Sequence, residues 1–288
     1  MTFKGDGILQ VTGIAVSPIL VSESFNLGQL GHYTLKNCAI ELHRINKRMD
    51  LEGFVNESPG NLKELTRVLC SNDFASTFFP SPVAAYPFVE NSETTLRDLL
   101  KTLSDPQLDM EFFTACDTIY LEYVWMYCRG RNLFRSADGR MGLGPRGMKP
   151  GDLISVWLGC NSVMILRPTG FGQYLVIGEA YCSGLVDGSA FLGPLPDSVE
   201  LVTRYFENFA MYRKTCINRA SGEFYREDPR LEGVALPEGW RRKEHADEEY
   251  LSWFVNDSTG EDIGNFDPRL SPEALESRGI KLQVFDLV

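Results

Sequence analysis

Apolar and polar residues alternate in two regions of this chain, and such alternation predicts β-strands. The first region is residues 8–21, where Gly13 and Pro18 interrupt the pattern, so we expect one or two short strands there. The second region begins after Gly151. It contains three apolar runs, at residues 152–158, 163–166 and 174–181. Short segments rich in Gly, Asn, Ser and Pro separate these runs, which indicates an antiparallel meander.

Apolar residues at helical spacing predict helices elsewhere in the chain. We expect helices at residues 33–51, 61–69, 91–103 and 198–216. Asn61 is placed to cap the second helix, with Glu64 at capping-box spacing. Residues 110–127 form a long apolar and aromatic run that favours a buried helix, although a pair of strands stays open because periodicity does not decide between them. Residues 76–87 contain three prolines and are predicted to form a loop, either a lid or a connector.

These elements together predict an α+β protein built around a small, mostly antiparallel β-barrel. The barrel strands are expected mainly in residues 8–21 and 134–190. Helices from residues 33–127 and 198–216 are expected to flank the barrel. Residues 219–288 form an extended C-terminal tail that we expect to wrap the outside of the same single domain.

The tail contains the sequence Asp-Pro-Arg-Leu twice, at Asp228–Leu231 and Asp267–Leu270. Two copies so far apart do not make a solenoid repeat. An Asp-Pro pair starts a turn, and the arginine that follows can reach back to carboxylates or backbone carbonyls. Both copies are therefore predicted to be turns that an arginine anchors.

The composition is that of a globular protein, with 43% hydrophobic and 11% aromatic residues. The net charge of -11 argues against nucleic acid and against an anionic membrane surface as partners. The N-terminal residues hold no apolar signal core, and no apolar run is long enough for a membrane span. We therefore expect a cytoplasmic protein whose seven scattered cysteines are reduced thiols.

Signatures of cofactor or metal chemistry are weak. Gly142–Gly147 is a literal G-x-G-x-x-G, but Pro145 lies inside it and a strand, not a helix, is predicted to follow. A dinucleotide site needs the helix, so we interpret the match as chance. The three histidines are dispersed, and the sequence contains no Cys-x-x-Cys pair. We expect no cofactor and no metal.

Two groups of residues are candidates for a site. Glu179 lies in mid-strand among apolar residues, and Arg167 and Arg135 are its natural partners. A structural ion pair and a catalytic acid both fit a carboxylate in such a position, and the ion pair is the commoner case. Several Tyr and Trp residues could also line a pocket for a large organic ligand, although ordinary core packing explains most of them individually.

Several longer segments of the sequence carry a family resemblance. They are Phe134–Pro145, Lys149–Asp152, Gly178–Gly188, Leu236–Trp240 and Leu270–Ile280. These segments resemble the C-terminal barrel region of fungal heterokaryon-incompatibility proteins. The resemblance implies an N-terminal effector domain with a Ser-Tyr-x-Trp-Gly-like signature, which drives a cell-death response to non-self, and this sequence shows nothing like it. Ser183 and Ser189 stand where the family pattern has His and Glu, which puts an activity built on those side chains in doubt.

Two functions follow as hypotheses, with a remnant without function as a third. The first is a cofactor-independent cyclase or isomerase of fungal secondary metabolism, acting on an apolar small molecule held by the barrel. Its catalytic residues would be Tyr181, Glu179 and Arg167, and its substrate-binding residues would be Trp157, Tyr174, Trp125 and Tyr123. The alternative is a non-enzymatic recognition or regulatory module of the incompatibility system, whose partner is a protein of the same family.

Overall fold

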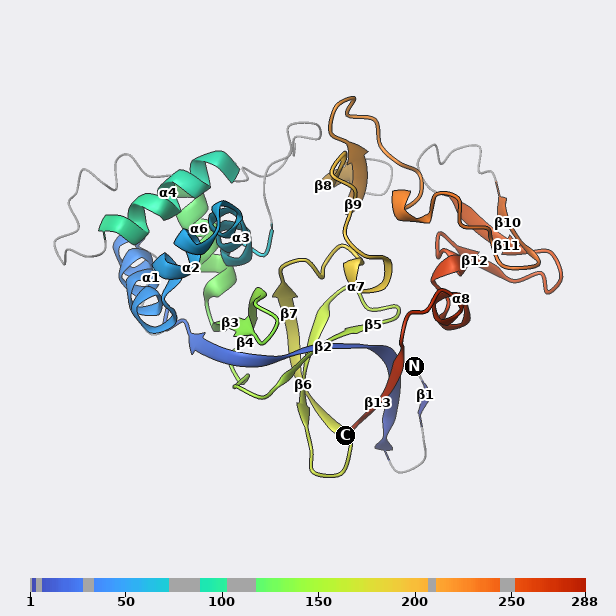
Figure 1. Ribbon diagram of the computed structural model, residues 1–288, viewed down its shortest axis with the longest axis horizontal. Helices are drawn as coiled ribbons and strands as arrows, with labels where there is room; N and C mark the ends of the chain where they lie inside the picture. The colour runs from blue at the N-terminus through green and yellow to red at the C-terminus, as the bar shows by residue number, and fades with distance from the viewer. Residues whose placement is uncertain are drawn as a thin grey trace.

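The structure is a computed structural model that describes residues 2–3, 7–27, 34–72, 89–102, 118–206, 211–243 and 252–288. The predicted loop at residues 76–87 lies outside the described residues. Helices, a barrel and smaller sheets make up the α+β fold (Figure 1).

Six antiparallel strands close into a β-barrel (Figure 1). In the order of pairing around the ring they are β2 (Leu9–Ser24), β3 (Arg131–Ser136), β4 (Met141–Pro145), β7 (Tyr174–Cys182), β6 (Val163–Pro168) and β5 (Leu153–Trp157). The ring closes because β2 pairs with β5 from Gly13 to Pro18 and with β3 from Ile19 to Ser24. The prediction of a barrel formed by residues 8–21 and 134–190 is confirmed.

Strand β2 is a single long strand, although Gly13 and Pro18 interrupt its sequence pattern. Its ladders contain two register shifts, between Ala15 and Ser17 and between Ile19 and Val21. Irregularities of this kind bend a strand and increase its twist. Because of these bends, β2 pairs first with β5 and then with β3, and this change of partner closes the ring.

Buried side chains form two clusters on opposite faces of the barrel wall. The larger one is formed by Ile19, Phe134, Met148, Ile154, Val156, Val163, Ile165, Ala180, Cys182 and Leu185. It fills the interior, as in other small barrels, which are packed cores rather than pores. The smaller one is formed by Val11, Trp157, Leu166, Phe285 and Leu287. Trp157 and Leu166 alternate with the interior residues of β5 and β6, so the smaller cluster lies on the outer face of these strands.

The last strand of the chain, β13 (Gln283–Leu287), joins the barrel sheet. It pairs antiparallel with residues 9–13 of β2, and Leu287 pairs with Tyr174 of β7. The tail, which we predicted to wrap the outside, thus also contributes a strand to the barrel sheet. The physical reason is its alternation, which directs Phe285 and Leu287 into the smaller core cluster.

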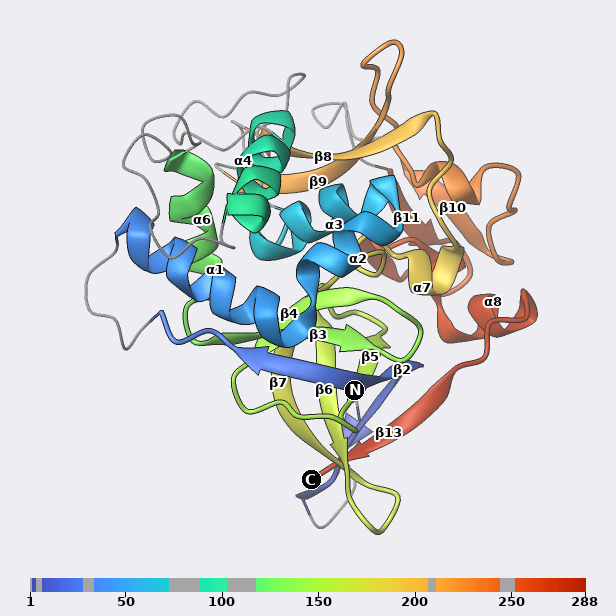
Figure 2. The same cartoon turned by 60° about the vertical axis from the view of Figure 1, so that its left-hand side comes forward.

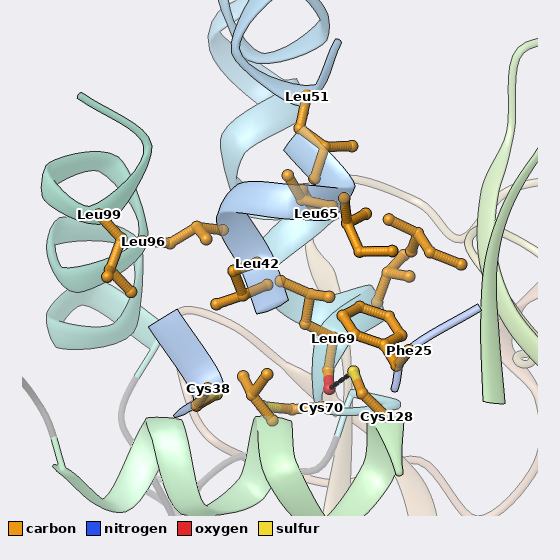
Figure 3. Close-up of a cluster of buried hydrophobic side chains, with 14 of the residues drawn as sticks. Phe25, Cys38, Leu42, Leu51, Leu65, Leu69, Cys70, Leu96, Leu99 and Cys128 are labelled. Carbon is orange, nitrogen blue, oxygen red and sulfur yellow. Dashed lines mark hydrogen bonds between the residues drawn. The ribbon is translucent and has the colours of Figure 1, made fainter. Parts of the chain in front are cut away.

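Five helices lie together over one end of the barrel (Figure 2). They are α1 (Leu35–Met49), α2 (Leu51–Glu57), α3 (Pro59–Leu69), α4 (Val89–Thr102) and α6 (Thr118–Cys128). Their apolar faces enclose a core that includes Phe25, Leu42, Leu65 and Leu69, all at most 1% exposed (Figure 3). Of the stretch 110–127, the described part from residue 118 is helical, and the rest lies outside the described residues.

The N-terminal cap of α3 differs from the prediction. Ser58 occupies the cap position and Pro59 follows it, which suits a helix start because proline needs no hydrogen-bond acceptor there. The side chain of Asn61 instead donates to the carbonyl of Phe54 in the preceding helix, at 2.7 Å. Asn61 thus ties α3 to α2 rather than capping α3.

The prediction of a helix at residues 198–216 is wrong. This region forms an antiparallel hairpin of β8 (Val199–Phe206) and β9 (Met211–Asn218). Its first half, Val-Glu-Leu-Val-Thr-Arg-Tyr-Phe, is rich in β-branched and aromatic residues, which favour strands. The apolar residues at helical spacing were thus a weaker signal than the side-chain types.

A short strand, β1 (Thr2–Phe3), precedes the barrel in the chain, and the remaining elements follow it. They are α7 (Ser189–Leu192), η3 (Pro229–Leu231), β10 (Trp240–Lys243), β11 (Trp253–Asn256), β12 (Asp262–Gly264), η4 (Pro268–Leu270) and α8 (Pro272–Ser277). Strands β10, β11 and β12 form a small sheet of their own, and β1 extends the barrel sheet at β2. Among the described residues, no helix combines the length and apolar character that crossing a membrane requires.

Candidate functional site

Strand β7 carries two of the predicted catalytic residues, Tyr181 and Glu179, on its outer face. Their neighbours Ala180 and Cys182 belong to the cluster inside the barrel, so alternation directs Tyr181 and Glu179 outward. Tyr181 lies under the helices and is 9% exposed, whereas no helix covers Glu179. The barrel interior therefore receives neither side chain.

Glu179 has a different partner and environment from those predicted. Its carboxylate is 63% exposed and forms an ion pair with Arg131 of β3 at 3.0 Å. Arg167 instead pairs with Asp152, whose side chain is 1% exposed. Apolar neighbours along the sequence suggested burial for Glu179, but those neighbours point to the opposite face of the strand.

Arg167, the third predicted catalytic residue, holds the start of β5 in place. Its guanidinium donates to both oxygens of Asp152 at 2.8 Å and to the carbonyl of Gly147 at 2.8 Å. Asp152 also accepts a hydrogen bond from the backbone of Lys149 at 2.8 Å. This bidentate pair stabilises the turn that precedes β5, and the hydrogen bonds that Arg167 donates to Asp152 are the main cause that raises the pKa of Arg167.

Tyr181 lies in an apolar contact between the barrel and the helices. Burial is the main cause that raises the pKa of its hydroxyl well above the ordinary value, and the nearby charge of Arg67 opposes that shift. A tyrosine in this state holds its proton at neutral pH. It can donate a hydrogen bond, but it is a poor general base.

The predicted substrate-binding residues lie in two separate cores. Trp157 and Tyr174 lie in the smaller cluster on the outer face of the barrel strands, where Tyr174 packs edge-on against Phe285 with ring centroids 5.4 Å apart. Trp125 and Tyr123 are on α6 and pack in the helical core. The fold thus does not bring the predicted pocket residues together.

The G-x-G-x-x-G match lies in β4 and the turn after it. Packing requires the first glycine, since a Cβ on Gly142 would come within 2.5 Å of the carbonyl oxygen of Tyr181. A Cβ on Gly144 would lie 2.7 Å from the sulfur of Met148, at the flexible end of that side chain. The next element after the motif is the strand β5, as predicted, whereas a dinucleotide site has a helix in this place.

Buried thiols gather in the helical core (Figure 3). Cys38, Cys70 and Cys128 are fully buried, and the thiol of Cys128 donates to the carbonyl of Leu69 at 3.5 Å. Burial raises the pKa of the Cys128 thiol well above its usual value, which makes it a weak nucleophile. The residues that the structure describes contain no group of three or more His, Cys, Asp or Glu side chains that could hold a metal ion.

The two Asp-Pro-Arg-Leu copies form the most extensive polar constellation of the molecule's C-terminal region. In each copy the aspartate caps a short 3-10 helix, η3 or η4, by accepting from the backbone of the arginine at 2.9 Å. Arg230 donates to the carbonyls of Asp187 and Gly193, which connects η3 to the segment after β7. The prediction of turns anchored by arginines is confirmed.

Arg269 connects the second copy to the first. Its side chain is 3% exposed, and it donates to the carbonyls of Leu231 and Val234 at 3.0 and 3.2 Å. It also pairs with Asp267 at 2.6 Å and with Glu227 at 2.5 Å. Because η4 leads into α8 and then β13, this arginine fixes the path by which the tail returns to the barrel.

Glu227 is the residue of this network that sequence reasoning missed. It receives hydrogen bonds from Arg242, Ser252 and Arg269, and those from Arg242 are the main cause that lowers its pKa to about 2. The signal available in the sequence was weak, since Glu227 simply precedes Asp228. We refer to Glu227, Asp228, Arg230, Asp267 and Arg269 as the arginine network.

The arginine network predicts a specific acid sensitivity. Ionised Glu227 stabilises the fold above the ordinary glutamate pKa of 4.5, and this contribution is lost as the pH falls from there toward 2. The difference in free energy of unfolding between the wild type and Glu227→Gln should therefore shrink over that window. Urea unfolding at pH 7, 4.5 and 2.5 measures it. The control is Asp257→Asn, in an exposed pair with Arg241, and a pH-independent difference for Glu227→Gln would contradict the prediction.

Known proteins are similar to this chain over a segment that includes most of the barrel. A family model described as "Het-6 beta-barrel domain" matches residues 97–192, which include β3 to β7. Over 90 residues the chain is 35% identical to "Heterokaryon incompatibility protein 6, OR allele" of Neurospora crassa. That segment is 29% of this chain and 13% of the relative's length. No solved structure matches the chain.

The matched residues supply five of the six barrel strands, and β2 supplies the sixth from outside them. Three of the segments that carry the family resemblance in the sequence, Phe134–Pro145, Lys149–Asp152 and Gly178–Gly188, lie within the matched residues. Residues 97–192 are thus similar to the Het-6 beta-barrel domain, and the chain is distantly similar, over part of its length, to a heterokaryon-incompatibility protein.

Proposed function

We propose that this chain is a non-enzymatic recognition or regulatory module of a fungal heterokaryon-incompatibility system and acts through a protein partner. The observation that carries the proposal is the Het-6 beta-barrel match together with the similarity to a heterokaryon-incompatibility protein. The relative's name comes from a much longer protein, of which the matched segment is 13%. Its role therefore comes to this chain as a proposal.

The positions of the predicted catalytic residues support recognition rather than chemistry. Arg167 is engaged in a structural ion pair, Glu179 lies outside on an exposed strand face, and Tyr181 is packed under helices. Catalysis needs reacting groups that converge on one substrate within hydrogen-bond reach. These three residues have separate structural environments, which gives no support to the hypothesis of a cyclase.

The experiment is deletion of the gene from the source fungus, followed by pairing against strains of different incompatibility type. We expect an altered fusion or cell-death reaction, because a recognition module acts on the response to non-self. Untargeted metabolite profiling of the same strains should show no change. Loss of one product, with accumulation of an uncyclised precursor of equal mass, would instead favour the cyclase.

Complementation of the deletion strain with variants distinguishes a recognition module from an enzyme. The variants Tyr181→Phe and Glu179→Gln remove the chemistry that a catalytic phenol or carboxylate would supply and keep nearly the same volume. Both should restore the incompatibility phenotype if the module only recognises a partner. A folded Tyr181→Phe protein that fails to complement would contradict the proposal.

A further inference from the structure

Arg67, near the end of α3, has no counterion among the residues that the structure describes. Its side chain forms no ion pair or hydrogen bond with them, and its Nε is buried. The residue as a whole is only half-buried, so solvent reaches part of it. A buried donor without an acceptor lowers stability, and most buried polar groups in native proteins have a partner. Packing of the fold alone therefore gives no reason for an arginine at this position.

Tyr181 lies beside Arg67, at the contact between α3 and the barrel. Glu64 and Arg67 are three residues apart on one face of α3, and Oε1 of Glu64 accepts from the backbone of Met141 at 3.4 Å. Tyr181 pairs with Leu143, two residues after Met141 and on the same face of β4. The charge of Arg67 also opposes the rise in the pKa of Tyr181, which places the guanidinium near the phenol.

The hydroxyl of Tyr181 is a second donor without an acceptor. Tyr181 is 9% exposed, and its hydroxyl forms no hydrogen bond with any residue that the structure describes. Buried tyrosine hydroxyls usually have a partner. Burial raises the pKa of this group, so it keeps its proton at neutral pH and can donate it to an anion. Arg67 and Tyr181, which we call the donor pair, thus offer a positive charge and a neutral O–H to one ligand.

The charges around the donor pair favour a singly charged ligand. Two carboxylates, those of Glu64 and Asp187, lie close enough to raise the pKa of Tyr181. Asp187 is engaged by the backbone of Ser189, which donates to it at 2.9 Å. These carboxylates repel a doubly charged phosphate more strongly than a carboxylate ion. A carboxylate also has two acceptor oxygens, so one can accept from the guanidinium and the other from the phenol.

Apolar side chains surround the donor pair. Met141, Leu143 and Tyr181 belong to the helical core, and Val186 packs against that core while only partly buried. A ligand with an apolar body gains from contact with such residues, whereas acetate brings almost no apolar area. We propose that this chain binds a small carboxylic acid with an apolar body between α3 and the end of β7, with its carboxylate on Arg67 and Tyr181.

The test is a titration of the full chain with sodium benzoate, followed by the NMR resonances of the Arg67 Nε–H group and of the backbone amide of Tyr181. We expect a saturable shift with a dissociation constant of about 1 mM, and at least ~10-fold weaker binding of acetate and of inorganic phosphate. Tyr181→Phe should weaken benzoate binding about tenfold, because it removes one hydrogen bond to a charged group. Arg67→Met should abolish the shift of the Tyr181 amide.

The matched control is Arg129→Met, because Arg129 is an exposed arginine directly after α6. This variant should bind benzoate as the wild type does. Arg67→Met should also unfold at the same temperature as the wild type or at a higher one, since it removes a buried donor that no described residue accepts. A much lower unfolding temperature would give Arg67 a structural role instead and overturn the proposal.

Three further results would overturn the proposal. They are the absence of a saturable shift up to about 50 mM benzoate, equal weakening by Arg129→Met and Arg67→Met, and tighter binding of phosphate than of benzoate. The proposal does not rest on the proposed function. The titration measures binding to the purified protein, whereas complementation follows the cell-death reaction, so either can fail while the other succeeds.

Discussion

Replacing Gly13 by alanine should destabilise the barrel by about 3 kcal/mol. Gly13 lies where β2 pairs with β5 on one side and with β13 on the other. A Cβ at this position would come within 2.9 Å of the Cα of Trp157 and closer still to the carbonyl oxygen of Val156. Both are backbone atoms, so no change of rotamer relieves the contact, and β2 would have to move away from a closed ring.

The matched control is Gly60→Ala in the first turn of α3. Apart from the backbone of the helix itself, the nearest atom to a Cβ there would be the hydroxyl oxygen of Ser58, 4.0 Å away. Alanine has the higher helix propensity, so this variant should be more stable by up to about 1 kcal/mol. Urea unfolding followed by circular dichroism measures both variants. Equal and small effects for the two would contradict the geometry of the β2–β5 crossing.

The barrel was largely predictable because its strands alternate or are bounded by turn residues. The three strands after Gly151 appeared as separate apolar runs, and the structure contains them as β5, β6 and β7. Gly13 and Pro18 were recognised only as interruptions of the first strand. In the structure they belong to one bent strand that pairs with both β5 and β3. This pairing joins residues that are distant in the sequence, and a local pattern of residues carries no information about it.

The two errors have different physical origins. Residues 198–216 place apolar side chains at spacings that fit a helix, while their β-branched and aromatic types fit the hairpin that forms between β8 and β9. The last strand, β13, is too short to stand out from a charged tail. It obtains its structure from β2 and β7, which are distant in the sequence, and such pairing outweighs weak local preference.

The candidate site was predicted less well than the fold. Residue type and position in a predicted strand selected Tyr181, Glu179 and Arg167, but the direction of each side chain depends on which face of the barrel it occupies. The helices then bury Tyr181 and leave Glu179 exposed. In contrast, the Asp-Pro-Arg-Leu anchors were predictable because the cap, the turn and the arginine follow one another along the chain.

Replacing Arg269 by methionine should destabilise the protein by about 3–5 kcal/mol, because the change leaves buried acceptors without their donor. The guanidinium satisfies the carbonyls of Leu231 and Val234 and the carboxylates of Asp267 and Glu227. Methionine keeps much of the apolar stem but supplies no hydrogen bond. Arg269→Lys should restore little of the loss, since an ammonium group cannot reproduce the bidentate pair with Asp267.

The control for this prediction is an arginine in an exposed ion pair. Arg241 pairs with Asp257, and their side chains are 54% and 59% exposed, so Arg241→Met should lower the free energy of unfolding by at most about 1 kcal/mol. Arg269 also directs the chain toward β13, so its loss should expose the amides of Gln283–Leu287 to hydrogen exchange before those of β5 and β6. Unfolding midpoints of the two variants together with exchange rates test both points. Equal losses for Arg269→Met and Arg241→Met, or unchanged protection of β13, would show that the arginine network does not hold the tail to the barrel.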